Sequence, residues 1–172
     1  MALTNGNTTL RALEPDDVEL LYRWENDKEV WKVSNTRTPI SRYMLANYIK
    51  TADRDIWESH EMRLLIETAE RKAVGTVELF DFDPYHSRAG IGIMVFENED
   101  RRRGIATEAF EIIADYAINE IGLAQIYVNI AQSNEASLQL FQKLGFEIVG
   151  IKKHWLRKPK GWEDELMLQK IF

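Results

Sequence analysis

Apolar and polar residues alternate along several stretches of the chain, and this period of two predicts β-strands. Three such stretches follow one another closely, at residues 61–67, 73–81 and 88–96. Because only short polar segments separate them, we expect an antiparallel meander. Alternating or β-branched stretches predict four more strands, at residues 8–13, 125–130, 147–155 and 163–171.

Apolar residues at intervals of three and four predict helices between these strands. The predicted helices begin at residues 15, 39, 104 and 134, and Gly122 and Gly145 end the last two. Residues 25–31 are interpreted as the end of the first helix and a loop, and residues 53–59 as a polar connection. The chain contains no internal repeat or linker, so we expect one domain over residues 1–172.

Composition narrows the class of protein. The chain is 45% hydrophobic, enough for a substantial core, but its apolar runs are too short to span a bilayer. It contains no cysteine, which excludes disulfides and a catalytic thiol, and its three histidines lack metal-ligand spacing, so we expect no metal. No signal-peptide pattern opens the chain, so we expect a cytoplasmic protein.

Charge points to one unusual segment. The net charge is −6 at pH 7, which disfavours a nucleic-acid partner, yet Arg101, Arg102 and Arg103 stand together before Gly104. A helix N-terminus leaves backbone N–H groups unpaired and carries partial positive charge. Glycine there lets a ligand approach the backbone closely. This strand, basic loop and helix therefore predict an anion site, most naturally for a pyrophosphate.

Two local patterns resemble one enzyme family. The pattern Arg-x-x-Gly-x-Ala at residues 101–106 resembles the acyl-CoA site of the GNAT-family N-acetyltransferases, whereas no Walker loop or dinucleotide fingerprint fits. Residues 134–146 resemble the helix and turn after that family's fifth core strand. Residues 10–17 resemble the start of its spermidine/diamine and ribosomal-protein N-terminal branches. The resemblance implies the GNAT acyl-CoA N-acyltransferase fold, an α/β (α+β) fold with a mixed central sheet of about seven strands and helices on both faces.

The resemblance also implies a site for acetyl-CoA. In this family two strands splay apart, pantetheine lies between them, and the helix N-terminus holds the pyrophosphate. Backbone groups of Met94, Val95 and Phe96 should then pair with pantetheine, and Asn134 should reach toward it. The full predicted set is Met94, Val95, Phe96, Arg101, Arg102, Arg103, Gly104, Ile105, Ala106, Thr107, Asn129, Asn134 and Lys143.

Glu78 is the candidate general base. An amine attacks a thioester only when neutral, and a primary amine is mostly protonated near pH 7, so a base is useful. Glu78 lies on the strand next to the one expected to splay. The alternative is a half-exposed strand carboxylate in a cross-strand ion pair.

The proton donor is less clearly marked. Many family members carry Tyr where Phe141 stands, and phenylalanine has no proton to give. Ser137 lies one helical turn earlier on the same face, and the ribosomal-protein branch has a serine there as proposed donor. Water is one alternative donor, and a Ser137 hydroxyl bonded only to its own backbone is another interpretation.

The predicted acceptor-binding residues are Glu25, Asp27, Glu29, Trp31 and Phe141. Carboxylates and an aromatic face suit a cationic chain. The family resemblance, together with these residues, implies an acetyl-CoA-dependent N-acetyltransferase for a primary amine, first a polyamine or diamine such as spermidine. The alternatives are a protein N-terminal acetyltransferase and a non-catalytic acyl-CoA sensor. The resemblance also suggests a homodimer or larger homo-oligomer, with no nucleic-acid or membrane partner.

Overall fold

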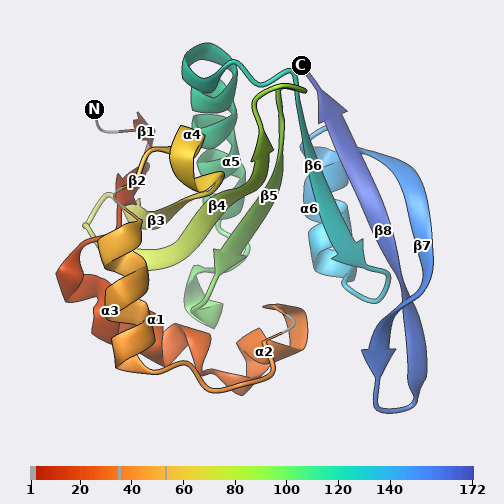
Figure 1. Cartoon of the computed structure of the whole chain (residues 1–172), viewed down its shortest axis with the longest axis horizontal. Coiled ribbons are helices and arrows are strands. Elements are labelled where there is room, and N and C mark those ends of the chain that lie inside the picture. The colour runs from red at the N-terminus through yellow and green to blue at the C-terminus, as the bar shows by residue number, and fades with distance from the viewer. Residues whose placement is uncertain (1–2, 35, 53) are drawn as a thin grey trace.

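An eight-stranded sheet with helices against both faces organises the protein (Figure 1). The computed structural model describes residues 3–34, 36–52 and 54–172. The strands are β1 (Leu3–Asn5), β2 (Thr8–Ala12), β3 (Met62–Thr68), β4 (Ala73–Asp83), β5 (Arg88–Val95), β6 (Gln125–Ala131), β7 (Glu147–Lys158) and β8 (Gly161–Ile171). The predicted fold class is confirmed, with one strand more than expected, because β1 is too short to show an alternating pattern.

The strands lie in the order β1-β2-β3-β4-β5-β6-β8-β7. Neighbouring strands are antiparallel throughout, except that β5 and β6 are parallel. The predicted meander is β3-β4-β5. A parallel pair needs a crossover connection, and here it includes α5 (Ile105–Tyr116) and the π-helix η3 (Ala117–Ile121).

The remaining helices are η1 (Pro15–Asp17), α1 (Val18–Glu25), α2 (Lys28–Ser34), α3 (Arg42–Thr51), α4 (Ile56–Ser59), η2 (Asn98–Asp100) and α6 (Glu135–Lys143). The predictions of loops at residues 25–31 and 53–59 are wrong where α2 and α4 form; Asp53 lies outside the described residues. Both helices are too short to show a clear periodicity. Aspartates nevertheless cap them, since Asp27 Oδ1 accepts from the Glu29 N–H at 2.8 Å and Asp55 Oδ1 from the Trp57 N–H at 3.0 Å.

Two hydrophobic cores lie on opposite faces of the sheet. Along β3, the side chains of Leu64 and Ile66 enter the larger core with α5 and α6, whereas Leu65 enters the smaller core with α1 and α3. This division follows from the alternation of side chains along a strand. The smaller core leaves much of its sheet face open toward β5, β6 and β8, and the candidate site lies there.

Candidate active site

The parallel strands β5 and β6 separate soon after they meet. Their register contains only the pairs Arg88 with Gln125, Ala89 with Ile126, and Gly90 with Tyr127. Both strands continue beyond these pairs, so a gap opens between them (Figure 1). Unpaired backbone polar groups need partners, and the facing edge of β5 therefore offers an extended ligand the hydrogen bonds of an additional strand.

The register decides which backbone groups of β5 face this gap. The Phe96 N–H donates to the Val74 carbonyl at 3.0 Å, so Phe96 points its N–H toward β4. Backbone direction alternates along an antiparallel strand, so Met94 also faces β4, while Ile93 and Val95 face the gap. The register therefore favours Ile93 and Val95 for hydrogen bonds with a ligand in the gap, and the sequence does not reveal register. The pairing of Met94, Val95 and Phe96 with pantetheine stays a prediction.

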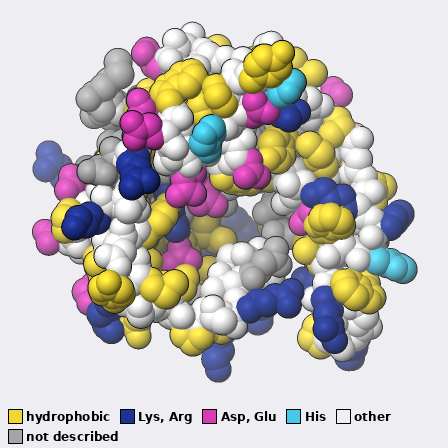
Figure 2. Space-filling view, viewed as in Figure 1, with side chains coloured by type: hydrophobic (Ala, Val, Ile, Leu, Met, Phe, Trp, Pro, Cys, Tyr) yellow, Lys and Arg dark blue, Asp and Glu magenta, His cyan; other side chains and the backbone are white. Residues whose placement is uncertain are grey.

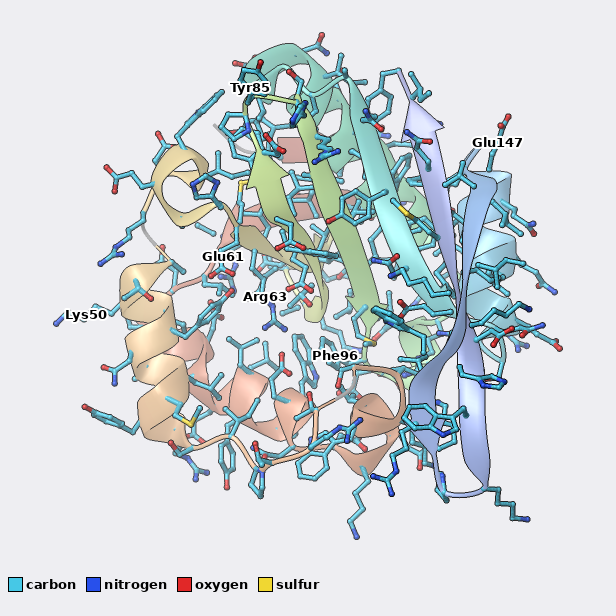
Figure 3. All side chains as sticks on the ribbon, turned by 45° about the vertical axis from the view of Figure 1, so that its right-hand side comes forward. Lys50, Glu61, Arg63, Tyr85, Phe96 and Glu147 are labelled. Carbon is cyan, nitrogen blue, oxygen red and sulfur yellow. The ribbon has the colours of Figure 1, made fainter. Side chains whose placement is uncertain are left out.

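The side chain of Arg101 binds the backbone at the end of β5. Its Nε donates to the Val95 carbonyl at 2.9 Å and its Nη2 to the Phe96 carbonyl at 3.1 Å. Figure 3 shows Phe96 at this end of the strand. Val95 therefore keeps only its N–H for a ligand. Arg101 shapes the loop, and a direct phosphate contact by its side chain stays a prediction.

The loop before α5 has the geometry that the sequence predicted for an anion site. Gly104 adopts φ 84° and caps the helix, and Arg102 before it adopts φ 62°. Such positive φ values favour glycine. The first helical bond runs from the Glu108 N–H to the Gly104 carbonyl at 3.0 Å, so helix geometry leaves the amides of residues 105–107 for a ligand.

A buried carboxylate anchors this loop from beneath. Asp100 is 2% exposed and accepts from Lys72 Nζ at 2.8 Å, and Arg103 lies 3.4 Å from its other oxygen. The side chain of Arg103 is nevertheless 66% exposed. Arg102 and Arg103 are therefore accessible to an anion above the helix N-terminus.

The other predicted cofactor residues lie across the gap. Asn134 caps α6 by accepting from the Ser137 N–H at 3.2 Å, which leaves its amide N–H₂ free to donate. Asn129 lies on β6 and accepts from Lys152 Nζ at 2.9 Å, which also leaves its N–H₂ group free. Lys143 ends α6, roughly 13 Å along the helix from Asn134. Contacts from these three residues to acetyl-CoA stay predictions.

Glu78 lies where β5 leaves β6. It pairs in register with Gly92, and a Cβ atom at Gly92 would stand 2.9 Å from Glu78 Oε1. A side chain at position 92 would therefore push the carboxylate out of this position. Burial raises the pKa of Glu78, as do the charges of Glu25 and Glu61, while the charge of Arg63 lowers it. A carboxylate with a raised pKa beside the gap is suited to accept a proton.

Arg63 is the functional candidate that the sequence analysis missed. It is the cross-strand partner of Glu78 in the register, yet its guanidinium forms its ion pair with Glu25 of α1. Arg63 and Glu61 lie between the sheet and the helices α1 and α3 (Figure 3). The Arg63 Nε is buried and has no partner among the described residues. The alternating patterns of β3 and β4 place Arg63 and Glu78 on the same face of the sheet. Only the register shows that the two residues are direct cross-strand neighbours.

The predicted acidic cluster divides between two environments. Glu25 is buried with Arg63. Asp27 and Glu29 are exposed on the surface at α2, and Glu29 pairs with Lys32 at 2.6 Å. Trp31 donates from its Nε1 to the Glu25 carbonyl at 2.6 Å, so the indole ties α2 to the end of α1. The structure thus brings Glu25, but neither Asp27 nor Glu29, into an ion pair beside Glu78.

Phe141 belongs to the core. It is 3% exposed and meets the Phe146 ring edge to face, with ring centroids 5.0 Å apart. The prediction that Phe141 contacts the acceptor is therefore wrong, because neighbouring side chains cover its ring. Ser137 is half-buried on the same helix, and its role as proton donor stays a prediction.

The face that carries Glu78 is hollowed between the α1–α3 side and the β7–β8 hairpin, and acidic side chains gather at the rim (Figure 2). A parallel strand pair with a gap, a basic helix N-terminus on one side and a half-buried carboxylate on the other suit a transferase that takes an acyl thioester and an amine. Residues 7–147 match the family described as acetyltransferase (GNAT) domain. The chain belongs to this family, as the sequence resemblance implied.

Three relatives illustrate the range of the similarity. Spermidine N(1)-acetyltransferase of Escherichia coli K12 is 28% identical over 145 residues, which cover 84% of this chain and 75% of that one. Spermidine N-acetyltransferase of Vibrio cholerae, solved with CoA and spermine, superimposes with a TM-score of 0.87 at 23% identity, covering 97% and 96% of the two chains. Another structure of the Vibrio protein is dodecameric. Mouse α/β-tubulin N-acetyltransferase 9 is 39% identical over 79 residues, 45% of this chain and 33% of that protein.

Among the residues with described positions, no helix is both long and apolar enough to cross a membrane. The same residues contain no group of three or more His, Cys, Asp or Glu side chains placed to hold a metal ion.

Proposed function

We propose that this protein transfers the acetyl group of acetyl-CoA to a primary amine of a polyamine such as spermidine. The observation that carries the proposal is the position of Glu78. Its carboxylate lies over Gly92, where β5 leaves β6 and a ligand in the gap would present its reacting end. The named relatives that acetylate spermidine support the choice of acceptor.

Each group has a role in a direct transfer. Glu78 takes a proton from the ammonium group, so that the neutral nitrogen attacks the thioester carbonyl carbon. As the C–N bond forms and the C–S bond breaks, gap-facing N–H groups of β5, such as that of Ile93, stabilise the charge on the carbonyl oxygen. The attached nitrogen then loses its second proton to solvent, which leaves the neutral amide. The departing thiolate takes a proton either from water or from Ser137, which recovers one from water. Arg63 forms an ion pair with Glu25, which keeps the positive charge of Arg63 in a fixed position near Glu78.

Charge favours a cationic acceptor over a neutral one. Glu25, Glu61 and Glu78 lie near one another, and Arg63 balances one of the three charges. A partly buried site with excess negative charge attracts ammonium groups and keeps them close to the carboxylate that must deprotonate one of them.

An amine panel tests the proposal. Purified protein is mixed with acetyl-CoA and spermidine, spermine, a simple alkylamine or short peptides, and thiol release is recorded. We expect the polyamines to give the highest kcat/KM. Turnover with peptides alone would contradict the proposal, and acetyl-CoA binding without any turnover would identify a sensor.

A protein N-terminus is the second candidate acceptor. The similarity to the mouse tubulin N-acetyltransferase supports a protein acceptor, although that similarity covers less than half of this chain. The Asn134-x-x-Ser137 pattern also resembles the ribosomal-protein branch. In this structure, however, Asn134 accepts from the Ser137 N–H as an ordinary helix cap, and such a cap does not indicate the acceptor. We therefore place the polyamine first.

We also propose that the protein works in the cytoplasm as a homo-oligomer. Ile148, Val149 and Ile151 are about half exposed on the edge strand β7. An edge strand with exposed apolar side chains pairs readily with another chain. Analytical ultracentrifugation tests this: a monomer at micromolar concentration would contradict it.

A further inference from the structure

A second hollow lies on the sheet face that carries Glu78, over the segment where β5 and β6 pair. It has a volume of about 590 Å³, and its lining includes Asp81, Tyr127, Asn129, Lys152 and Gln169. The register places Tyr127 beside Gly90 of β5 and Asn129 further along β6, past the last pair. This hollow therefore borders the place where acetyl transfer is proposed.

A β-bulge brings Asp81 into this hollow. The register of β4 with β5 shifts after Phe80, and Asp81 within the shift adopts φ 50°. Bulges redirect side chains, and aspartate tolerates a positive φ better than most residues. The Tyr127 hydroxyl donates to Asp81 Oδ2 at 3.2 Å, which confirms that the carboxylate turns toward β6. Burial and the charge of Asp81 raise the pKa of Tyr127, so the phenol stays a donor.

Aromatic rings separate Glu78 from Asp81. Phe80 shares its face with Glu78 by strand alternation, and its ring covers Gly90 so closely that a Cβ there would lie 2.3 Å from the ring. Phe80 meets Tyr127 edge to face, with centroids 6.2 Å apart. Along β4 the order is thus carboxylate, aromatic wall, carboxylate. Three residues of strand span roughly 10 Å.

The charges around the hollow leave Asp81 available for a cation. Arg88 pairs with Asp83 at 3.2 Å, and Lys152 pairs with Glu165 at 2.8 Å. Within the described residues, Asp81 forms no ion pair. The two cations thus pair with other carboxylates and not with Asp81.

We propose that Asp81 binds the distal ammonium of the acceptor, so that the hydrocarbon spacer lies along Phe80 and Tyr127 while the reacting nitrogen lies at Glu78. Two carboxylates separated by an apolar wall match two ammonium groups separated by methylenes. The inference rests on the proposed amine acetylation and adds a length requirement to it. A diamine long enough to reach both carboxylates is preferred over an alkylamine of the same length.

The test compares α,ω-diaminoalkanes of increasing length with n-alkylamines of equal carbon number. For wild type, we expect kcat/KM of the diamines to exceed that of the monoamines by about five-fold at the best length, the size of one exposed ion pair. Asp81→Asn should abolish this preference by lowering the kcat/KM of the diamines to that of the monoamines. Asparagine also tolerates a positive φ, so the bulge should survive. Higher salt should reduce the wild-type preference.

Two further variants make the result decisive. Asp115→Asn removes the same charge from the exposed surface of α5 and should retain the diamine preference. Glu29→Gln removes a carboxylate from α2, the other direction in which a long acceptor could extend. Loss of the preference in Glu29→Gln but not in Asp81→Asn would overturn the inference, as would a preference unchanged in Asp81→Asn. If wild type acetylates no amine at all, the proposed function itself fails.

Discussion

The two sides of the gap between β5 and β6 offer different kinds of group to the ligands proposed for them. On the α5 side, a continuous stretch around Gly104 presents backbone N–H groups, and its shape depends on positive φ values at Arg102 and Gly104. On the opposite face, Glu25, Arg63 and Glu78 come from α1, β3 and β4 and act through their side chains. Substitutions that alter backbone conformation should therefore damage the first side, and substitutions that alter charge should damage the second.

The largest effect should follow removal of the base. Glu78→Gln keeps the shape of the side chain but cannot take a proton, and general base catalysis is worth ~10²–10⁴-fold. We expect kcat/KM for spermidine to fall by that factor while the Kd for CoA stays unchanged, as measured by thiol release and calorimetry. In wild type, kcat/KM should rise with pH through a pKa above the usual glutamate range, because burial raises it. Wild-type activity in the variant would assign deprotonation to water.

Removal of Arg63 should affect both stability and pH dependence. Arg63→Met leaves Glu25 buried without its partner, and breaking a buried pair costs about 3–5 kcal/mol. It also removes the positive charge that lowers the pKa of Glu78, so the acidic limb of the pH–rate profile should move to higher pH. Denaturant unfolding and pH profiles measure the two effects.

The matched control for Arg63 is the double variant Arg63→Met/Glu25→Gln, which removes the stranded charge. It should regain part of the lost stability. A double variant no more stable than Arg63→Met would show that the pair is not what holds α1 against the sheet.

A substitution that disturbs the backbone conformation at Gly104 should weaken the binding of CoA. A Cβ there meets no atom within 4 Å, so the cost of Gly104→Val comes from its φ of 84°. That strain is about 1–3 kcal/mol, and it should weaken CoA binding roughly 5- to 150-fold. Gly6→Val is the control, since Gly6 also has a positive φ and open space but lies in the β1–β2 turn. Equal CoA affinities in the two variants would contradict the backbone model.

Ser137 should have a smaller effect. Its N–H is already used in the cap with Asn134, and water can protonate a thiolate. We expect Ser137→Ala to lower kcat less than ~10-fold, below the range of an essential general acid. A fall beyond ~10²-fold, with unchanged Kd for CoA, would instead identify Ser137 as the proton donor.

The smallest effect should be on Tm, because the ionised Glu78 carboxylate lowers the stability of the folded state. Its folded-state pKa is raised, so the ionised carboxylate disfavours the folded state once the pH exceeds the ordinary value of 4.5. Glu78→Gln should therefore raise Tm slightly near pH 7, and the gain should vanish as the pH falls below 4.5. Thermal unfolding across this range measures it. A lower Tm at neutral pH would mean that attraction to Arg63 outweighs burial.

The sequence alone determined most of the elements and the candidate cofactor loop. Alternation predicted the meander, helical spacing and caps predicted α5 and α6, and the Arg-x-x-Gly-x-Ala pattern indicated the proposed anion site, because each of these features depends on residues close together in the chain. The short helices α2 and α4 escaped because one or two turns carry too little periodicity.

Only the tertiary structure decided which side chains meet. Glu25, Arg63 and Glu78 are far apart in the sequence, and their contact depends on the packing of α1 against the sheet and on the β3–β4 register. A shift of one residue would turn a strand's side chains to the other face without altering its alternating pattern. For the same reason, register alone placed Ile93 rather than Met94 at the gap. Local periodicity determines what each element is, whereas pairing and packing between distant elements determine which charges share a site.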